Sequence, residues 1–137
     1  MSSSGPHLAC PGRRATVLER VSATGTRRPG PPHSHRDEDE FSFAFRGRIG
    51  GRVGNHDVVV EEGGFLFKPR GIVHTMWNQT DVDAILLEFL SPPGLERFFE
   101  ETGRASPETV PEIATRYGLT LHPELIAELS ALYGVSP

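Results

Sequence analysis

The sequence predicts an all-β domain that is followed by helices. Residues 33–90 consist of short β segments separated by Gly, Pro, Asn or Asp at intervals of about ten residues, a spacing typical of an antiparallel sandwich or barrel. Phe41, Phe43 and Phe45 alternate with small side chains, and a period of two marks a strand whose two faces differ. A chain of 137 residues favours one compact domain rather than two.

The chain divides into three predicted parts. Residues 1–14 have the Ser-, Gly- and Pro-rich composition of a flexible N-terminal tail, and they lack the charged region and apolar core of a signal peptide. Residues 15–92 form the predicted β-barrel, whose first strand spans residues 15–23. Residues 93–137 form a predicted C-terminal helical extension.

Further strands are predicted inside the barrel segment. The apolar runs Val-Val-Val at 58–60 and Phe-Leu-Phe at 65–67 fit buried strands. Between strands, Gly-Asn-His-Asp at 54–57 predicts a hairpin turn. Residues 84–90 predict the last strand, which the Ser-Pro-Pro-Gly sequence at 91–94 closes.

The spacing of apolar residues then changes from that of strands to that of helices. A first helix is predicted at residues 95–102, with Gly103 in the usual stop position. Ser-Pro at 106–107 predicts the cap and first turn of a second helix that runs to about residue 117. A third helix is predicted from residues 122–124 to near residue 134, and its apolar stripe consists of Leu125, Leu129, Leu132 and Tyr133.

Charge and composition argue against several classes of partner. The formal net charge is −4, and no basic stripe of the kind that binds nucleic acid is present. No apolar run approaches the roughly 20 residues that are needed to span a bilayer. The single cysteine excludes an internal disulfide. We therefore expect a cytoplasmic protein with no nucleic-acid partner and no membrane partner.

Three histidines and a glutamate are candidate metal ligands. His33 and His35 are two residues apart, so on an extended strand both rings point to one face, with backbones roughly 7 Å apart. Glu40 follows His35 at an odd offset, so the polar stretch 36–39 must turn the chain and return Glu40 on a neighbouring strand. His74 supplies a third imidazole. This set suits one divalent transition-metal ion (Fe, Mn, Ni, Cu, Co or Zn), and an open barrel leaves coordination positions free for chemistry.

Two longer patterns contain these candidate ligands. The first, G-x5-H-x-H-x3,4-E-x6-G, is matched, apart from its opening glycine, by His33, His35, Glu40 and Gly47. The second, G-x5-P-x-G-x2-H-x3-N, is matched in full by Gly63, Pro69, Gly71, His74 and Asn78. With these motifs, residues 16–90 resemble the cupin superfamily. Residues 92–103 are similar to the C-terminal segment of small bacterial cupins that are quercetin dioxygenase-like.

The resemblance implies a fold, a cofactor and an assembly. The fold is the double-stranded β-helix, or jelly-roll barrel, of cupins, and it holds one metal ion at the site of the four candidate ligands. Small cupins commonly pair through their outer strands, so we expect a homodimer whose interface the Phe-rich segments supply.

The inner row of the barrel is predicted to form a substrate pocket. If Glu40 points inward, alternation sends Ser42 and Ala44 inward as well, and such small side chains leave space above the ion. Met76 lies two residues after a candidate ligand, so it either lines the same cavity or simply fills the barrel, with Trp77 on the reverse face. The acidic residues at 37–39 are interpreted as a solvated turn, and the remaining histidines as surface residues: His7, His56 and His122.

The leading functional hypothesis is a dioxygenase-like oxidation of a small aromatic, phenolic or enol-type molecule. In this reaction Glu40 is the predicted catalytic residue, because a carboxylate released from the ion can act as a base for a substrate hydroxyl. Two alternatives remain open. One is a redox-neutral isomerase or cyclase acting on a polyketide-like or sugar-like intermediate, which turnover without oxygen would reveal. The other is a non-catalytic cupin that binds a small molecule.

Overall fold

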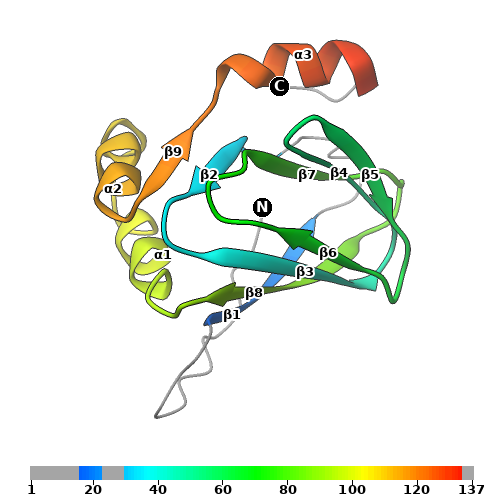
Figure 1. The fold of residues 1–137 in the computed structure, drawn as a ribbon, viewed down its shortest axis with the longest axis horizontal. Helices are drawn as coiled ribbons and strands as arrows, with labels where there is room; N and C mark the ends of the chain where they lie inside the picture. Colours follow the sequence, from blue (N-terminus) through cyan, green and yellow to red (C-terminus); the bar gives the residue numbers. More distant parts are fainter. Residues whose placement is uncertain (1–15, 23–29, 134–137) are drawn as a thin grey trace.

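Two antiparallel sheets face each other in the computed structural model, which describes residues 16–22 and 30–133 (Figure 1). The four-stranded sheet has the order β1-β8-β3-β6, with bounds Thr16–Ser22, Ala84–Ser91, Asp39–Arg46 and Phe65–Lys68. The five-stranded sheet has the order β5-β4-β7-β2-β9, with bounds His56–Val60, Ile49–Val53, His74–Asn78, His33–His35 and Leu119–Leu121. The predicted double-stranded β-helix is therefore confirmed.

The predicted strands lie close to the observed ones. β1 spans Thr16–Ser22, within the strand that is predicted at residues 15–23. Residues 15 and 23, and the tail predicted at residues 1–14, lie outside the described residues. The hairpin turn predicted at 54–57 is shorter, because β5 already begins at His56 and pairs with β4 from that residue onward.

Alternation along β3 separates an inner face from an outer face, as predicted. Ser42 and Ala44 are fully buried, whereas Phe41 and Phe45 are 41% and 59% exposed on the other side. An apolar cluster in the interior joins both sheets and consists of Ala44, Ile49, Val60, Ala84 and Leu86. The inner row of β3 therefore faces the packed interior, and its phenylalanines face away from it.

The two apolar runs form strands, but the prediction that they are buried is wrong. Val59 is 48% exposed, and Phe65 and Phe67 are 68% and 48% exposed. β5 and β6 are edge strands of their sheets, and these side chains lie on outer faces that the described residues leave open. Each run is thus half-buried, with one face in the barrel and one in solvent.

The C-terminal segment forms the predicted helices and one strand that was not predicted. The helices are α1 (Glu96–Thr102), η1 (Pro107–Thr109), α2 (Val110–Arg116) and α3 (Glu124–Tyr133). None of the helices in the described part of the chain has the length and apolar character to cross a bilayer. The unpredicted strand is β9, which joins the five-stranded sheet beside β2. α1 and α2 share an apolar cluster with strands of both sheets, consisting of Leu90, Leu95, Phe98, Ile113, Ala114 and Leu119.

α3 lies over the outer face of the five-stranded sheet (Figure 1). Its Leu129 is fully buried and packs with Trp77 of β7, so that part of the predicted stripe is confirmed. Leu132 is 59% exposed, so its predicted place in the stripe is wrong. On β4, Gly50 lies opposite Trp77, and a Cβ there would come within 2.3 Å of the indole nitrogen. Only glycine leaves room for the indole between β4 and α3.

Truncating Leu129 should therefore weaken the whole fold. We expect Leu129→Ala to lower the free energy of unfolding by about 2–4 kcal/mol, because it removes a fully buried side chain and leaves a cavity against Trp77. Leu132→Ala, on the exposed side of the same helix, should change it by less than about 0.5 kcal/mol. Urea unfolding followed by far-UV circular dichroism measures both. Equal effects of the two substitutions would contradict this packing.

Candidate metal centre

Four side chains from both sheets converge in the interior. His33 and His35 come from β2 and His74 from β7, both in the five-stranded sheet, whereas Glu40 comes from β3 in the opposite sheet. Each offers one nitrogen or oxygen atom, and these four atoms all lie within 4.8 Å of one another. The structure thus brings together the four residues predicted to bind the metal.

Local backbone contacts place these donors. β2 and β7 pair so that His33 lies directly opposite His74. The chain bends at residues 36–38 and crosses to the other sheet, which puts Glu40 on a different strand from His35, as its odd offset required. Gly71, with a φ of 76°, donates its backbone N–H to the carbonyl of His35 at 2.7 Å and so ties the loop before β7 to β2.

β9 holds β2 from its other side. Ser34 pairs with Thr120, and the backbone N–H of Arg36 donates to the carbonyl of Gly118 at 2.8 Å. The backbone N–H of His122 donates to the carbonyl of Pro32 at 2.8 Å. A strand of only three residues is therefore clamped between two neighbours, and two of the four donors depend on a segment near the C-terminus.

The ring orientations turn Nε2 atoms toward one another. His33 donates from Nδ1 to the carbonyl of Pro31 at 2.7 Å, which leaves the lone pair of the neutral ring on Nε2. Nδ1 of His74 lies 3.2 Å from the carbonyl of Ile72, so its Nε2 also faces the cluster. Nε2 of His33 lies 3.2 Å from Nε2 of His35. Nε2 of His74 is buried without a hydrogen-bond partner among the described residues, 3.0 Å from Oε2 of Glu40. Electron-rich atoms gathered in this way fit a positively charged ion at their centre.

Charge and burial set the protonation of the donors. Burial first, and then the nearby His74, lower the pKa of His33 from 6.5 to about 3, so its ring is neutral and ready to bind metal. Burial alone would raise the pKa of Glu40. The Lys68 ammonium and the neighbouring rings of His35 and His74 outweigh burial and hold the pKa of Glu40 well below its ordinary value of 4.5.

A family comparison agrees with this geometry. A family model described as a cupin domain matches residues 23–90, the segment that contains all four donors. The chain belongs to the cupin superfamily. No curated protein matches it by sequence.

Solved structures show the same cupin fold at low sequence identity. An uncharacterised protein with a double-stranded β-helix domain from Klebsiella pneumoniae is 14% identical with a TM-score of 0.59, over 88% of this chain and 82% of that one. KdgF from Halomonas sp. is 14% identical with a TM-score of 0.57, over 70% and 81%. A mutant salicylate 1,2-dioxygenase from Pseudoaminobacter salicylatoxidans, in complex with gentisate, is 21% identical with a TM-score of 0.54, over 63% and 23%.

Two charged residues in the interior of this cupin were not predicted. Lys68 is 1% exposed and donates from Nζ to Oε1 of Glu40 at 2.6 Å and to Oε1 of Glu88 at 3.2 Å. Glu88, on β8, is itself 4% exposed. The sequence did contain the signal, because strand alternation that places Phe65 and Phe67 outside places Lys68 inside.

The predicted pocket residues lie on the inner side of the cupin barrel. Ser42 is fully buried, and its hydroxyl donates to Sδ of Met76 at 3.3 Å and to Oε1 of Glu88 at 3.4 Å. Met76 is half-buried and packs against the apolar cluster that contains Ala44, whereas Trp77 faces the other way, under α3, as predicted. A substrate-binding role for Ser42, Ala44 and Met76 stays a prediction.

The interpretation of residues 37–39 as a solvated turn is wrong for one of them. Asp37 is exposed, but Glu38 is only 8% exposed, and burial raises its pKa. Its Oε2 lies 3.7 Å from Nδ1 of His35, behind the ring of that candidate ligand. His56 is exposed and His122 half-buried, whereas His7 lies outside the described residues.

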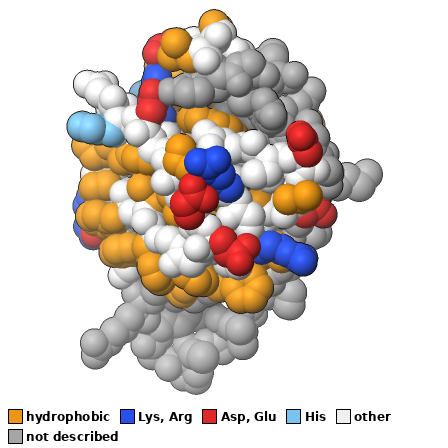
Figure 2. All heavy atoms as spheres, turned by 90° about the vertical axis from the view of Figure 1, so that its right-hand side faces the viewer, with side chains coloured by type: hydrophobic (Ala, Val, Ile, Leu, Met, Phe, Trp, Pro, Cys, Tyr) orange, Lys and Arg blue, Asp and Glu red, His pale blue; other side chains and the backbone are white. Residues whose placement is uncertain are grey.

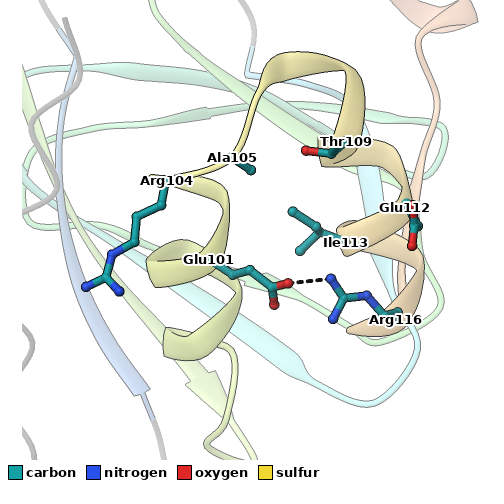
Figure 3. Close-up of a pocket in the computed structure, with 7 residues that line it drawn as sticks. All are labelled: Glu101, Arg104, Ala105, Thr109, Glu112, Ile113 and Arg116. Atoms are coloured by element: carbon teal, nitrogen blue, oxygen red, sulfur yellow. Dashed lines mark hydrogen bonds and ion pairs between the residues drawn. The ribbon is translucent and has the colours of Figure 1, made fainter.

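A separate hollow of about 420 Å³ lies between α1 and α2 (Figure 3). Glu101 and Arg116 form an ion pair across it, and the hydroxyl of Tyr117 donates to Glu101 at 3.1 Å. The residues that line it come from the helical segment and include none of the four candidate ligands, so this hollow is distinct from the metal centre.

The neutral state of His33 makes the stability of the metal-free protein depend on pH. The unfolded chain protonates His33 near pH 6.5, whereas the folded protein keeps the ring neutral down to about pH 3. Because the unfolded state binds the extra proton in this window, we expect the free energy of unfolding to fall as the pH is lowered from 6.5 toward 4.5. Urea unfolding in the presence of a chelator at several pH values measures the slope.

Two substitutions isolate the contribution of His33. His33→Asn should flatten the slope between pH 6.5 and 4.5, whereas His56→Asn, at an exposed position on β5, should leave it as in the wild type. Parallel slopes for the wild type and His33→Asn would show that this ring does not remain neutral in the folded state.

Proposed function

We propose that this cupin is a metal-dependent enzyme that carries out a dioxygenase-like oxidation of a small aromatic, phenolic or enol-type molecule. One divalent transition-metal ion binds His33, His35, Glu40 and His74. The observation that carries the proposal is the convergence of imidazole nitrogens and one carboxylate oxygen, within 4.8 Å of one another, in the interior of a barrel.

The donor set selects the kind of ion. Neutral imidazoles with a single carboxylate suit Fe, Mn, Co, Ni, Cu or Zn better than Mg or Ca, which prefer oxygen ligands. When bound, such an ion supplies Lewis-acid and oxygen-activating chemistry. The dioxygenase from Pseudoaminobacter salicylatoxidans, which was crystallised with the aromatic acid gentisate, supports an oxidative reaction for this fold.

The protein itself supplies proton acceptance and shape. Glu40 is buried and ionised, so an acidic substrate hydroxyl that releases it from the ion passes its proton to this carboxylate. A hydroxyl of low pKa, as in phenols and enols, suits this carboxylate best, because Lys68 keeps the basicity of Glu40 low. Ser42, Ala44 and Met76 form the wall against which the substrate packs.

Metal content and oxygen uptake test the proposal. The protein is stripped with a chelator, reloaded separately with Fe²⁺, Mn²⁺, Co²⁺, Ni²⁺, Cu²⁺ or Zn²⁺, and analysed for bound metal by mass spectrometry. We expect about one ion per chain, and oxygen consumption with at least one metal on a panel of catechols, flavonols, salicylate and gentisate. His74→Ala should lower metal affinity by at least about tenfold, whereas the exposed His56→Ala should not change it.

The other outcomes separate the alternatives. Turnover of a substrate under strict anaerobiosis would replace oxidation with a redox-neutral isomerase or cyclase reaction. Binding of a small molecule with the same affinity with and without metal would indicate a non-catalytic cupin. Failure to retain any of the six ions would remove the metal centre itself.

We also propose that the protein is a homodimer that forms through the outer face of the four-stranded sheet. Phe41 stacks on Phe67 with ring centroids 4.6 Å apart, and the ring centroids of Phe43 and Phe65 are 4.7 Å apart, so a row of two aromatic pairs lies across β3 and β6. Hydrophobic side chains gather in a band along the lower rim of the described surface in Figure 2. Exposed apolar patches of this kind are typical of protein interfaces, and aromatic residues are enriched there.

Charge placed in this row should separate the subunits. We expect the wild type to have twice the chain mass of 15.0 kDa in solution, and Phe41→Asp/Phe67→Asp to shift it to the monomer, because a dimer would bury the added carboxylates. Light scattering coupled to gel filtration gives the mass. Leu132→Asp, at an exposed position on α3, is the control that should remain dimeric. A wild type of 15.0 kDa at all concentrations would exclude the dimer.

A further inference from the structure

Lys68 is the only lysine in the chain, and it lies in the interior of the barrel, 1% exposed. The other basic residues are arginines. On β6 it stands directly opposite Glu40 of β3, and Glu88 of β8 lies on the far side of β3, opposite Ser42. Three adjacent strands of one sheet therefore direct charged side chains into the same part of the interior.

The two oxygens of Glu40 have different neighbours. Oε2 lies 2.9 Å from Nε2 of His35 and 3.0 Å from Nε2 of His74, so it faces the metal cluster. Oε1 accepts a hydrogen bond of 2.6 Å from Nζ of Lys68, on the side away from the rings. The ammonium thus fixes the rotation of the carboxylate and determines which oxygen points at the imidazoles.

Lys68 is held in turn by groups that do not belong to the cluster. Its Nζ donates to Oε1 of Glu88 at 3.2 Å and approaches Sδ of Met76 at 3.6 Å. Hydrogen bonds to charged partners on two sides give a buried ammonium one position, because moving it would leave a charge unpaired in the interior. A fixed cation is a suitable device for orienting a carboxylate ligand.

We propose that Lys68, anchored by Glu88, is a positioning residue that makes Glu40 a one-oxygen ligand of the metal ion. The proposal rests on the metal centre of the proposed function and adds a residue to it. By engaging Oε1, Lys68 prevents Glu40 from turning both oxygens to the ion, and so leaves a coordination position for a substrate atom.

Charge and position predict different effects of removing Lys68. If its positive charge only repelled the ion, an uncharged side chain would raise metal affinity and leave the coordination geometry unchanged. If it positions Glu40, the same substitution frees the carboxylate to turn both oxygens to the ion, which changes the coordination geometry. A change in coordination geometry therefore distinguishes the two roles.

Lys68→Met tests this, since methionine has a similar length and no charge. Co²⁺ is the probe, because its visible absorption reports coordination number, and competition with a chromophoric chelator gives its affinity. We expect Co²⁺ bound to Lys68→Met to show the weaker visible absorption per bound ion that a higher coordination number gives. An unchanged spectrum overturns the proposal at any affinity: with tighter binding it would mean that Lys68 only repels the ion, and with weaker binding it would assign Lys68 to stability alone.

Two further variants keep the test decisive. Leu66→Ala removes another inward side chain from β6 without touching Glu40, and it should leave the Co²⁺ spectrum as in the wild type. If Lys68→Met does not fold, Glu88→Gln weakens the anchor instead, and it should shift the spectrum in a protein whose circular dichroism is native. An unshifted spectrum in Glu88→Gln then overturns the proposal. A wild type that binds no Co²⁺ would instead contradict the proposed function itself.

Discussion

The contacts between Glu40 of one sheet and the histidines of the other are the constraint on which the centre of this cupin depends. Oε2 of Glu40 approaches His35 and His74 to 2.9 and 3.0 Å across the interior, so the two sheets must stand at a separation that only their correct packing gives. The donors are not neighbours on one surface. The site therefore exists only when the barrel is closed, and its formation reports the closure of the fold.

The two sheets differ in what covers them. α3 packs on the outer face of the five-stranded sheet, and β9 extends that sheet to hold β2. The outer face of the four-stranded sheet instead presents stacked phenylalanines to solvent in the described part of the chain. Burying aromatic area costs little side-chain entropy, so this face suits the dimer that we propose. The four candidate metal ligands lie between the two sheets, which shield them from both sides.

Much of this arrangement is predictable from the alternation of residues along single strands and from motif spacing, and the rest depends on which strands pair and in what register. Alternation from Glu40 to Phe45 gave the inner and outer faces of β3 correctly, and the motif spacings located all four donors. β9 was missed because three residues, Leu-Thr-Leu, carry too little periodicity to be separated from the flanking helices. Lys68 and Glu88 were overlooked because a charged residue at an inward position makes sense only when the opposing charge is known, and that requires the register of β6, β3 and β8.

The contact between Trp77 and Leu129 gives the molecule a built-in optical reporter. Trp77 is the only tryptophan in the chain, and its indole lies between the backbone of Gly50 and the buried face of α3. Its fluorescence therefore senses whether α3 is docked on the five-stranded sheet. Emission that changes before the far-UV circular dichroism of the strands would reveal detachment of that helix ahead of melting of the barrel.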